Sequence, residues 1–285
     1  MKIAICPNII KDKSFFYTLQ VIEKLKTLKV EILMSKEYLK YINNNESIYF
    51  YDDIEDLIYN SDIVLTIGGD GTLIKFAKYA ANYEKPILGI NLGRVGFLTG
   101  LEKNELFKLD LLCKNDFKIQ KRTMLKITTE SETNKTFFAV NDMVVSRGEL
   151  SKIIDFSIFL DGNEVCNYRA DGIIVSTSTG STAYSLSAGG PIVDPSLDCM
   201  ILTPICSHSM FARPIVFSNQ ASVIVNVKSR ENSKVFLYVD GNNVLEVTDC
   251  NKIKVECSNK TISMISFDER SFYKRLSEKL SARVN

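Results

Sequence analysis

Three glycines surround an aspartate in the segment from Gly68 to Thr72, which reads Gly-Gly-Asp-Gly-Thr. Glycines lack the Cβ atoms that keep an anion away from backbone N–H groups. The segment also comes directly before a helical pattern, and the first N–H groups of a helix have no intrahelical partner. We therefore predict a phosphate-binding loop at this point. Its members are Gly68, Gly69, Thr72 and Lys75.

Asp70 stands at the centre of this loop, where a carboxylate would repel a phosphate that is merely held. The residue makes sense as a base that accepts the proton of an attacking hydroxyl. It could equally help to hold the magnesium that accompanies a nucleotide's phosphates. A turn whose aspartate only caps the following helix explains the same spacing about equally well. The spacing alone leaves these interpretations open.

Hydroxyl side chains crowd around Gly180 in the segment from Ser176 to Ser185, a few residues after Arg169 and Asp171. The segment precedes a short helical stretch that ends at Gly189-Gly190-Pro191, where the residue types are those of a helix stop. Such a loop can form hydrogen bonds with a sugar and a phosphate. Composition alone slightly favours a plain Ser/Thr connection over this binding role.

Asn141 and Asp142 interrupt the apolar run from Phe137 to Val145. Polar groups inside a buried strand need hydrogen-bond partners, and these are most often neighbouring backbone groups. The alternative is that the two side chains reach into a cleft and bind ribose hydroxyls. Both interpretations are compatible with the pattern.

A further glycine-spaced loop runs from Asn91 to Leu98, directly after a predicted strand. We expect it at the same edge of the sheet as Asp70, because open α/β sheets bind ligands beyond the carboxyl ends of their strands. The loop would then form a second wall of the cleft. We give about half the weight to an ordinary turn with a core phenylalanine.

Several familiar motifs are absent from the sequence. It contains neither the Gly-x-Gly-x-x-Gly fingerprint of dinucleotide-binding folds nor a P-loop, so a bound nucleotide needs another device. His208 is the only histidine, which excludes catalysis or a metal site that requires two. The seven cysteines include no Cys-x-x-Cys pair, a pattern that fits neither a disulfide framework nor a zinc site. We expect no resident metal.

Composition narrows the class of protein further. The 35 basic and 34 acidic side chains give a net charge of +1, so no general field attracts nucleic acid or an anionic membrane. No stretch approaches the roughly 20 consecutive apolar residues of a membrane helix, and the N-terminal apolar run is too short for a signal peptide. We expect a soluble cytoplasmic protein with neither a nucleic-acid nor a membrane partner.

The elements that must position these residues change character along the chain. The first part alternates short apolar strands with helical patterns, as in Ile63–Ile67 followed by the buried stripe of Leu73, Phe76, Ala77 and Ala80. Such alternation requires crossover helices on the faces of a mostly parallel sheet. We therefore assign residues 1–120 to an α/β domain.

The second part is predominantly β. From Thr123 the apolar segments are short, and Asp161-Gly162 and Asp240-Gly241 signal tight turns between them. One of these β-rich segments, expected to form a single strand, extends from Phe137 to Ser146. We assign residues 121–267 to a β-rich domain. The stretch from Glu269 to Leu280 returns to a helical pattern, and we expect residues 268–285 to pack back on another element.

Taken together, these motifs resemble the NAD kinase family over nearly the whole chain. The Gly-Gly-Asp-Gly-Thr loop alone is not specific, because diacylglycerol and sphingosine kinases, and more loosely phosphofructokinases, carry related loops. The combination of motifs is specific. In chain order it comprises Gly68–Thr72, Asn91–Thr99, Ala139–Asp142, Asp171–Gly172 with Ser178–Tyr184, Gly189–Val193, Thr203–Ser209 and Arg213–Val216.

The resemblance implies a fold and a reaction. The family's fold is an α/β N-terminal domain and a β-rich, NAD-binding C-terminal domain, with a final helix that returns to the first domain. The reaction transfers a phosphoryl group from ATP to the 2′-hydroxyl of the adenosine ribose of NAD, giving NADP. Mg²⁺ or another divalent cation would accompany the donor, without a tightly bound cofactor. Other nucleoside triphosphates and polyphosphate stay open as donors. Family members are usually homodimers or homotetramers.

The resemblance also assigns roles to residues. Asp70 would be the general base, and Gly71 would lie beside the dinucleotide. Asn141 and Asp142 match the pair that binds ribose and adenine. The family contacts the nicotinamide end, or a neighbouring subunit's ligand, at the positions of Arg169 and Asp171. The other implied NAD-binding residues are Phe97, Lys152, Thr182, Ala183, Tyr184, Ser185, Leu186, Ser187 and Asn242.

Two of these residues, Tyr184 and Phe97, resemble the family's aromatic contacts to the nucleotide, which suit stacking on a flat base. Three positions depart from the pattern of many relatives. Asp142 stands where many have Glu, Lys152 where some have His, and Asn242 where some have Gln. The Asp142 carboxylate still accepts hydrogen bonds from ribose hydroxyls, but its reach is shorter by a methylene.

Two other functions compete with this interpretation. A lipid kinase could use the same glycine-aspartate loop, but it would need a membrane-facing apolar or basic surface, of which the balanced charge gives no sign. A non-catalytic NAD-binding regulator would carry the same motifs and would never produce NADP with any donor.

Overall fold

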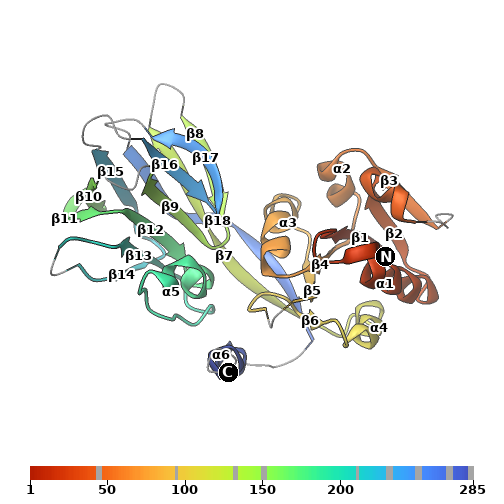
Figure 1. Cartoon of the computed structure of the whole chain (residues 1–285). Helices are drawn as coiled ribbons and strands as arrows, with labels where there is room; N and C mark the ends of the chain where they lie inside the picture. Colours follow the sequence, from red (N-terminus) through yellow and green to blue (C-terminus); the bar gives the residue numbers. More distant parts are fainter. Residues whose placement is uncertain are drawn as a thin grey trace. The chain divides into compact units, whose positions relative to one another are not determined.

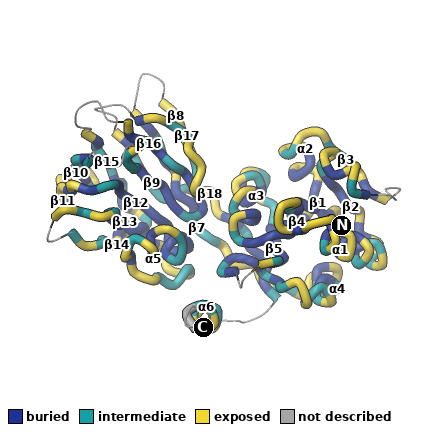
Figure 2. Tube along the Cα trace, viewed as in Figure 1, coloured by how far each residue is buried: buried dark blue, intermediate teal, exposed yellow. Residues whose placement is uncertain are grey.

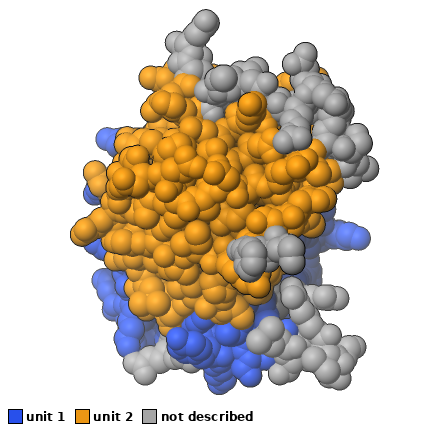
Figure 3. Space-filling view, turned by 90° about the vertical axis from the view of Figure 1, so that its left-hand side faces the viewer, with its two compact units in different colours: residues 1–121, 262–285 blue, residues 122–261 orange. Residues whose placement is uncertain are grey.

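The computed structural model describes residues 1–42, 47–93, 96–130, 134–148, 153–209, 212–228, 234–247, 252–267 and 272–281. The chain divides into two compact units, which Figure 3 distinguishes by colour. Unit 1 comprises Met1–Lys121 with Ile262–Asn285, and unit 2 comprises Arg122–Thr261. Each unit has a hydrophobic core of its own. None of the described helices is long and apolar enough to cross a membrane.

The sheet of unit 1 is parallel, with the strand order β3-β2-β1-β4-β5. Every residue of β4 and β5 is buried, as expected of parallel strands covered on both faces. Met264, near the end of β18, pairs in parallel with Ile87 of β5. The strands are β1 (Lys2–Pro7), β2 (Glu31–Ser35), β3 (Ile48–Tyr51), β4 (Ile63–Gly68), β5 (Ile87–Asn91), β6 (Leu101–Glu102) and β18 (Lys252–Ser266).

Helices connect these strands, and Figure 1 shows their places along the chain. The crossover from β4 to β5 is made by α3, whose predicted stripe of Leu73, Phe76, Ala77 and Ala80 is buried. The helical elements of unit 1 are η1 (Lys13–Phe15), α1 (Phe16–Thr27), η2 (Lys36–Tyr41), α2 (Ile54–Tyr59), α3 (Asp70–Asn82), η3 (Leu106–Lys108), α4 (Leu109–Cys113) and α6 (Phe272–Ser281).

The apolar repeat of Phe15, Leu19, Ile22, Leu25 and Leu28 predicts an amphipathic helix here, with Leu19 on its buried face. The helix forms as α1, but the Leu19 side chain is 37% exposed. Thr18, Val21, Ile22 and Leu25 are buried instead. These four positions follow the i, i+3, i+4, i+7 spacing, so the buried stripe is shifted by one residue at its start.

Unit 2 is built from antiparallel strands. One sheet has the order β14-β13-β12-β9-β16-β17, and a second set pairs β11, β10, β15 and the first part of β18. Figure 2 shows the buried inner strands in dark blue. The elements are β7 (Lys118–Glu130), β8 (Lys135–Ala139), β9 (Asp142–Arg147), β10 (Ile154–Leu160), β11 (Asn163–Ala170), β12 (Gly172–Thr177), η4 (Thr179–Thr182), α5 (Tyr184–Ser187), β13 (Cys199–Ile205), β14 (Ile215–Ser218), β15 (Val223–Lys228), β16 (Val235–Val239) and β17 (Asn242–Val247).

The predicted fold class is confirmed: a mostly parallel α/β sheet comes first, an antiparallel β region follows, and α6 contacts the start of α3. The predicted tight turns also form, because Asp161-Gly162 and Asp240-Gly241 all have positive φ. The continuous strand predicted from Phe137 to Ser146 is wrong. It breaks into β8 and β9 at Val140 and Asn141, whose N–H groups bind a side chain instead of a neighbouring strand.

Candidate active site

The glycine loop lies where β4 ends and α3 begins. Asp70 is the first residue of α3, and Gly69, its extended N-cap residue, supplies no side-chain hydrogen bond to the helix. The N–H groups of Thr72 and Leu73 donate to the Gly69 carbonyl at 2.9 and 3.1 Å. The Asn8 amide donates to the Thr72 hydroxyl at 3.0 Å, which fixes the loop to the end of β1. The loop therefore presents the positive end of a helix, as an anion site requires.

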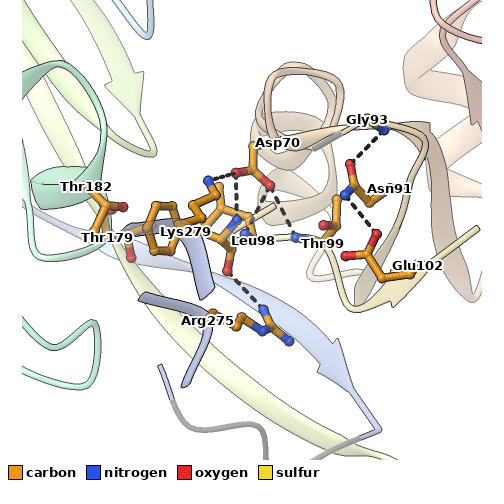
Figure 4. Close-up of polar contacts among 11 residues, drawn as sticks. Asp70, Asn91, Gly93, Leu98, Thr99, Glu102, Thr179, Thr182, Arg275 and Lys279 are labelled. Carbon is orange, nitrogen blue, oxygen red and sulfur yellow. Dashed lines mark hydrogen bonds and ion pairs between the residues drawn. The ribbon is translucent and has the colours of Figure 1, made fainter. Parts of the chain in front are cut away.

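The Asp70 carboxylate is held by a second loop, at residues 97–99, as Figure 4 shows. One oxygen, Oδ2, accepts the Phe97 N–H at 2.8 Å. The other, Oδ1, accepts the N–H groups of Leu98 at 3.0 Å and Thr99 at 3.4 Å. Three backbone donors thus fix the orientation of a carboxylate that keeps 27% of its side-chain surface exposed. Such an acid is preorganised and still accessible.

Gly96 makes this approach of the two loops possible. A Cβ atom at Gly96 would lie 2.5 Å from Asp70 Oδ1 and 2.3 Å from the Thr99 hydroxyl oxygen. Any other residue at this position would push the carboxylate away. The loop is also tied at its start, since the Asn91 amide donates to Glu102 Oε2 at 2.9 Å and its Oδ1 accepts the Gly93 N–H at 3.2 Å.

The C-terminal helix α6 adds two cations to this region (Figure 4). Arg275 Nη1 donates to the Phe97 carbonyl at 3.0 Å. Lys279 Nζ lies 3.7 Å from the centroid of the Phe97 ring and 3.9 Å from Asp70 Oδ2. The Phe97 ring also contacts Phe272, with centroids 6.2 Å apart. Phe97, predicted as an NAD-binding residue, is therefore packed against α6.

The place of Lys75 in the phosphate loop stays a prediction. Lys75 is exposed on α3, and its ammonium lies 5.3 Å from the centroid of the Phe76 ring. A different lysine approaches the glycines, because Lys11 Nζ lies 2.7 Å from the place where a Cβ atom at Gly69 would stand. Lys11 belongs to none of the sequence motifs described above. Its backbone N–H donates to the Asn8 carbonyl, so the turn after β1 sets its position.

A second candidate site is a pocket of about 450 Å³ in unit 2. Four residues predicted to bind NAD line it together: Asn141, Asp142, Ala183 and Tyr184. The other lining residues are Val144, Ser146, Tyr238, Asp240 and Gly241. A pocket with two acids, an amide and exposed aromatic surface can bind a flat heterocycle and sugar hydroxyls.

The wall of this pocket depends on a close contact between two segments. One runs from Thr177, at the end of β12, to Gly180 in η4, and the other is Val140 and Asn141, which separate β8 from β9. The Thr177 hydroxyl donates to the Val140 carbonyl at 2.8 Å, and the Thr177 N–H donates to the Asn141 carbonyl at 2.9 Å. A Cβ atom at Gly180 would lie 2.1 Å from the Asn141 carbonyl oxygen. Glycine is thus required at the centre of the hydroxyl-rich segment because two backbones touch there.

Asp240 holds the other side of the break. Its carboxylate accepts the N–H groups of Val140 at 2.8 Å, Asn141 at 2.7 Å and Asp142 at 3.2 Å. The Asp142 side chain beside it is buried, with 5% exposure. Burial and the neighbouring Asp240 carboxylate raise the pKa of Asp142 to about 7, and a hydrogen bond from the Tyr184 backbone opposes this shift.

Several other predicted residues have structural partners instead of facing this pocket. Arg169 is exposed and lies 3.6 Å from Asp155, and Asp171 accepts a hydrogen bond from Arg147 at 2.7 Å. The Ser185 hydroxyl is buried at 2.8 Å from the Thr203 hydroxyl.

The remaining predicted positions are placed as follows. The Thr182 hydroxyl donates to the Thr179 carbonyl within η4, at 3.4 Å. The Asn242 amide turns back to the carbonyls of its own turn, at 3.4 and 3.5 Å. Leu186 is half-buried and Ser187 is exposed on α5. A Cβ atom added at Gly71 would have no atom of the described residues within 4 Å. Lys152 lies outside the described residues.

The sequence interpretation missed Asp240, Tyr238, Lys279 and Arg275. Asp240 was visible only as part of a turn signal, although an acid in such a turn can also bind backbone N–H groups. The two α6 cations had no local signal, because Phe97 lies 178 residues before Arg275 in the chain and Asp70 lies still further from Lys279. No group of three or more metal-binding side chains occurs in the part of the chain that the structure describes.

Comparison with known proteins covers nearly the whole chain. Residues 3–117 match the family model of the ATP-NAD kinase N-terminal domain, and residues 140–267 match that of the ATP-NAD kinase C-terminal domain. An NAD kinase of Ruminiclostridium cellulolyticum is 35% identical over 289 residues, covering 99% of this chain and 98% of the relative. An NAD kinase of Clostridium tetani is 42% identical over 225 residues, covering 78% of this chain and 81% of the relative.

Two solved structures are similar over the full length. The NAD kinase from Archaeoglobus fulgidus in complex with ATP superposes with a TM-score of 0.75 at 26% identity, covering 99% of each chain. The yeast NADH kinase complexed with NADH gives a TM-score of 0.89 at 24% identity, covering 100% of this chain and 89% of the other. At that identity the yeast enzyme shows the fold alone.

Proposed function

The chain belongs to the NAD kinase family, and we propose that it transfers a phosphoryl group from ATP to the 2′-hydroxyl of the adenosine ribose of NAD, giving NADP. The observation that carries this reaction is the fixed Asp70 carboxylate at the N-terminus of α3. A base and an anion site then occur within one loop, which is what attack by a hydroxyl on a phosphate requires.

The chemistry assigns one role to each part of the loop. Gly69 and Gly71 leave the first N–H groups of α3 open to the donor's phosphate oxygens, and Thr72 closes the loop from behind. Asp70 accepts the proton of the 2′-hydroxyl as its oxygen attacks phosphorus. The three N–H groups of residues 97–99 hold the carboxylate in place throughout.

The acceptor NAD is assigned to the pocket in unit 2. Asn141 and Asp142 would bind the ribose hydroxyls and adenine, with Tyr184 stacking on the base. Thr182 to Ser187, Arg169, Asp171, Lys152 and Asn242 are proposed as further NAD-binding positions on the strength of the family resemblance. Phe97 and Gly71 are proposed on the same ground.

The phosphoryl donor and its divalent cation are both assigned to the glycine loop, residues 68–72. ATP is favoured because the similar Archaeoglobus enzyme was solved in complex with ATP. Mg²⁺ typically binds through one or two carboxylates together with substrate phosphates, and Asp70 supplies one such carboxylate beside the phosphate loop. When bound, the cation would reduce the negative charge that the donor's phosphates present to the incoming hydroxyl.

Three wider features belong to the same proposal. Residues 1–120 with 268–285 would form the domain that carries the phosphate loop, and residues 121–267 the NAD-binding domain. The family resemblance supports a homodimer or homotetramer. The described cysteines are all free thiols, which supports a reducing, cytoplasmic location.

The test is to incubate purified protein with NAD, ATP and Mg²⁺ and to follow NADP with an NADP-specific dehydrogenase. Parallel reactions replace ATP with GTP or polyphosphate, and phosphorus NMR of the product identifies a 2′-phosphate. We expect NADP with ATP. NADP formed only from polyphosphate would overturn the donor and preserve the acceptor. NAD binding without NADP from any donor would instead indicate a non-catalytic NAD-binding regulator.

A further inference from the structure

Phosphoryl transfer needs positive charge at the oxygens of the moving phosphate, and this chain has no P-loop lysine to supply it. Lys75, the residue that the sequence pattern offers, is exposed on α3 with its ammonium near the Phe76 ring. Among the ion pairs of the described residues, the Asp70 carboxylate pairs with Lys279 and not with Lys75. The cation at that carboxylate comes from the other end of the chain.

Lys279 of α6 is that cation. Its Nζ lies 3.9 Å from Asp70 Oδ2 and 3.7 Å from the centroid of the Phe97 ring (Figure 4). The side chains of Lys279 and Asp70 are 28% and 27% exposed, so both are partly shielded from water and still accessible to a ligand. An ammonium in this position can reach an oxygen of any phosphate whose phosphorus is attacked beside Asp70.

Arg275 fixes the position of Lys279. The two residues are four apart in α6 and therefore share one face of the helix. Arg275 donates a hydrogen bond to the Phe97 carbonyl, and the backbone N–H of Phe97 donates to the Asp70 carboxylate. Helix α6 is therefore bonded to Phe97, the residue whose N–H orients the Asp70 carboxylate. Phe97 is the residue through which Lys279 and Asp70 are held in register.

We propose that Lys279 is a catalytic residue that binds the transferred phosphoryl group beside Asp70, and that Arg275 is a positioning residue for both. The inference rests on the proposed NAD kinase activity. In the step, the 2′-oxygen forms a bond to the γ-phosphorus while the bond from that phosphorus to the bridging β-oxygen breaks. ADP leaves with that oxygen, and the hydroxyl proton passes to Asp70. Lys279 keeps its protons and stabilises the charge on the non-bridging oxygens.

The contact between Lys279 and Asp70 does not prevent this role. A partly exposed ion pair at 3.9 Å is weak. A triphosphate carries several negative charges and can compete for the ammonium without a large penalty. The pair keeps the ammonium at the site until the donor arrives.

The test is steady-state kinetics of Lys279→Met, Lys279→Arg and Lys274→Met, with melting temperatures measured in parallel. Lys274→Met removes the same charge from an exposed position of the same helix and serves as the control. We expect kcat of Lys279→Met to fall about 100-fold, the loss typical of one transition-state donor. Its KM for NAD should change less than threefold. Lys279→Arg should recover at least about tenfold of the lost rate, and Lys274→Met should match the wild type.

The inference is overturned if Lys279→Met retains more than half of the wild-type kcat, or if Lys274→Met loses as much as Lys279→Met. Should Lys279→Met melt at a lower temperature than the wild type, Lys279→Gln keeps a polar side chain and repeats the comparison. A stable Lys279→Gln with normal kcat would also overturn it. An inactive wild type would refute the proposed function, whereas an active wild type with unaffected Lys279 variants refutes only the role of Lys279.

Discussion

One aspartate in each unit holds a loop in the same way. Asp70 accepts the backbone N–H groups of residues 97–99, at 2.8, 3.0 and 3.4 Å. Asp240 accepts those of residues 140–142, at 2.8, 2.7 and 3.2 Å. In both cases one carboxylate oxygen takes the first N–H and the other takes the next two. The same hydrogen-bond pattern therefore orders two unrelated segments.

The surroundings of the two carboxylates are opposite. Asp70 faces the Lys279 ammonium, whereas Asp240 lies beside the buried carboxyl of Asp142, whose pKa is raised to about 7. A cationic environment suits a site where phosphate charge must be accommodated. An acidic, partly neutral one suits hydrogen bonds to sugar hydroxyls and base nitrogens. The neighbours of each acid therefore differ while its backbone partners do not, and the neighbours favour different kinds of ligand.

Among variants that keep both aspartates, the largest effect is expected when the hydrogen bonds between residues 97–99 and the Asp70 carboxylate, called here the Asp70 clamp, are disturbed. Gly96→Ala places a Cβ atom where the Asp70 Oδ1 atom now lies only 2.5 Å away, so the carboxylate must move. A displacement of about 1 Å can cost about 100-fold in rate, and we expect that loss in kcat with little change in KM for NAD.

The matched control for this variant is Gly93→Ala in the same loop. Among the described residues, an added Cβ atom there has only Asn91 Oδ1 nearby, at 3.9 Å. Kinetics of both variants at saturating substrates check the prediction. Equal rates for Gly96→Ala and the wild type would show that the position of the Asp70 carboxylate is unimportant.

A smaller effect, on stability and NAD binding, is expected at residues 140–142, whose N–H groups donate to Asp240 in what is called here the Asp240 clamp. Gly180→Ala forces apart η4 and the Asn141 carbonyl, which lies 2.1 Å from the added Cβ atom. Such overpacking costs roughly 1–3 kcal/mol of stability. Because the move also widens the pocket wall, we expect KM for NAD to rise about tenfold while KM for ATP changes little. Urea unfolding and kinetics measure both effects, and an unchanged KM for NAD would argue against NAD binding in this pocket.

The smallest effect concerns pH. The folded-state pKa of Asp142, about 7, lies above its unfolded value of 3.8, so the folded state binds the proton more tightly. Stability from this group is present below about pH 4 and is lost as the pH rises towards 7. Asp142→Asn lacks this loss, so its stability relative to the wild type should rise by roughly 1 kcal/mol per pH unit between pH 5 and 7. Urea unfolding at several pH values measures the difference, and a constant difference would contradict the raised pKa.

Much of unit 1 could be predicted because its signals are local. The glycine loop, the buried strand before it and the apolar stripe of α3 are all encoded within about 20 neighbouring residues, and all three form as predicted. Asn141, Asp142 and Tyr184 also come together in one pocket. The family resemblance grouped these three residues. Local periodicity alone would not have placed them in one pocket.

The remaining parts could not be predicted for a physical reason. The donors to Asp70 lie 27 to 29 residues along the chain, and the donors to Asp240 lie 98 to 100 residues away. Arg275 and Lys279 belong to a helix whose charged residues look like an ordinary solvated face. Only the packing of α6 gives them a partner.

The most direct test of the account is to compare Asp70→Asn with Asp240→Asn. Each variant replaces one carboxylate oxygen by an NH₂ group, which cannot accept a hydrogen bond. Asp70 and Asp240 each accept three backbone N–H groups, so the two variants lose comparable hydrogen bonds. NAD binding is measured by calorimetry, and the single-turnover rate of NADP formation is measured with saturating ATP and Mg²⁺. We predict that Asp70→Asn binds NAD normally and loses at least about 1,000-fold in rate, while Asp240→Asn loses NAD affinity. An Asp70→Asn enzyme with near-normal rate would contradict the central role of Asp70.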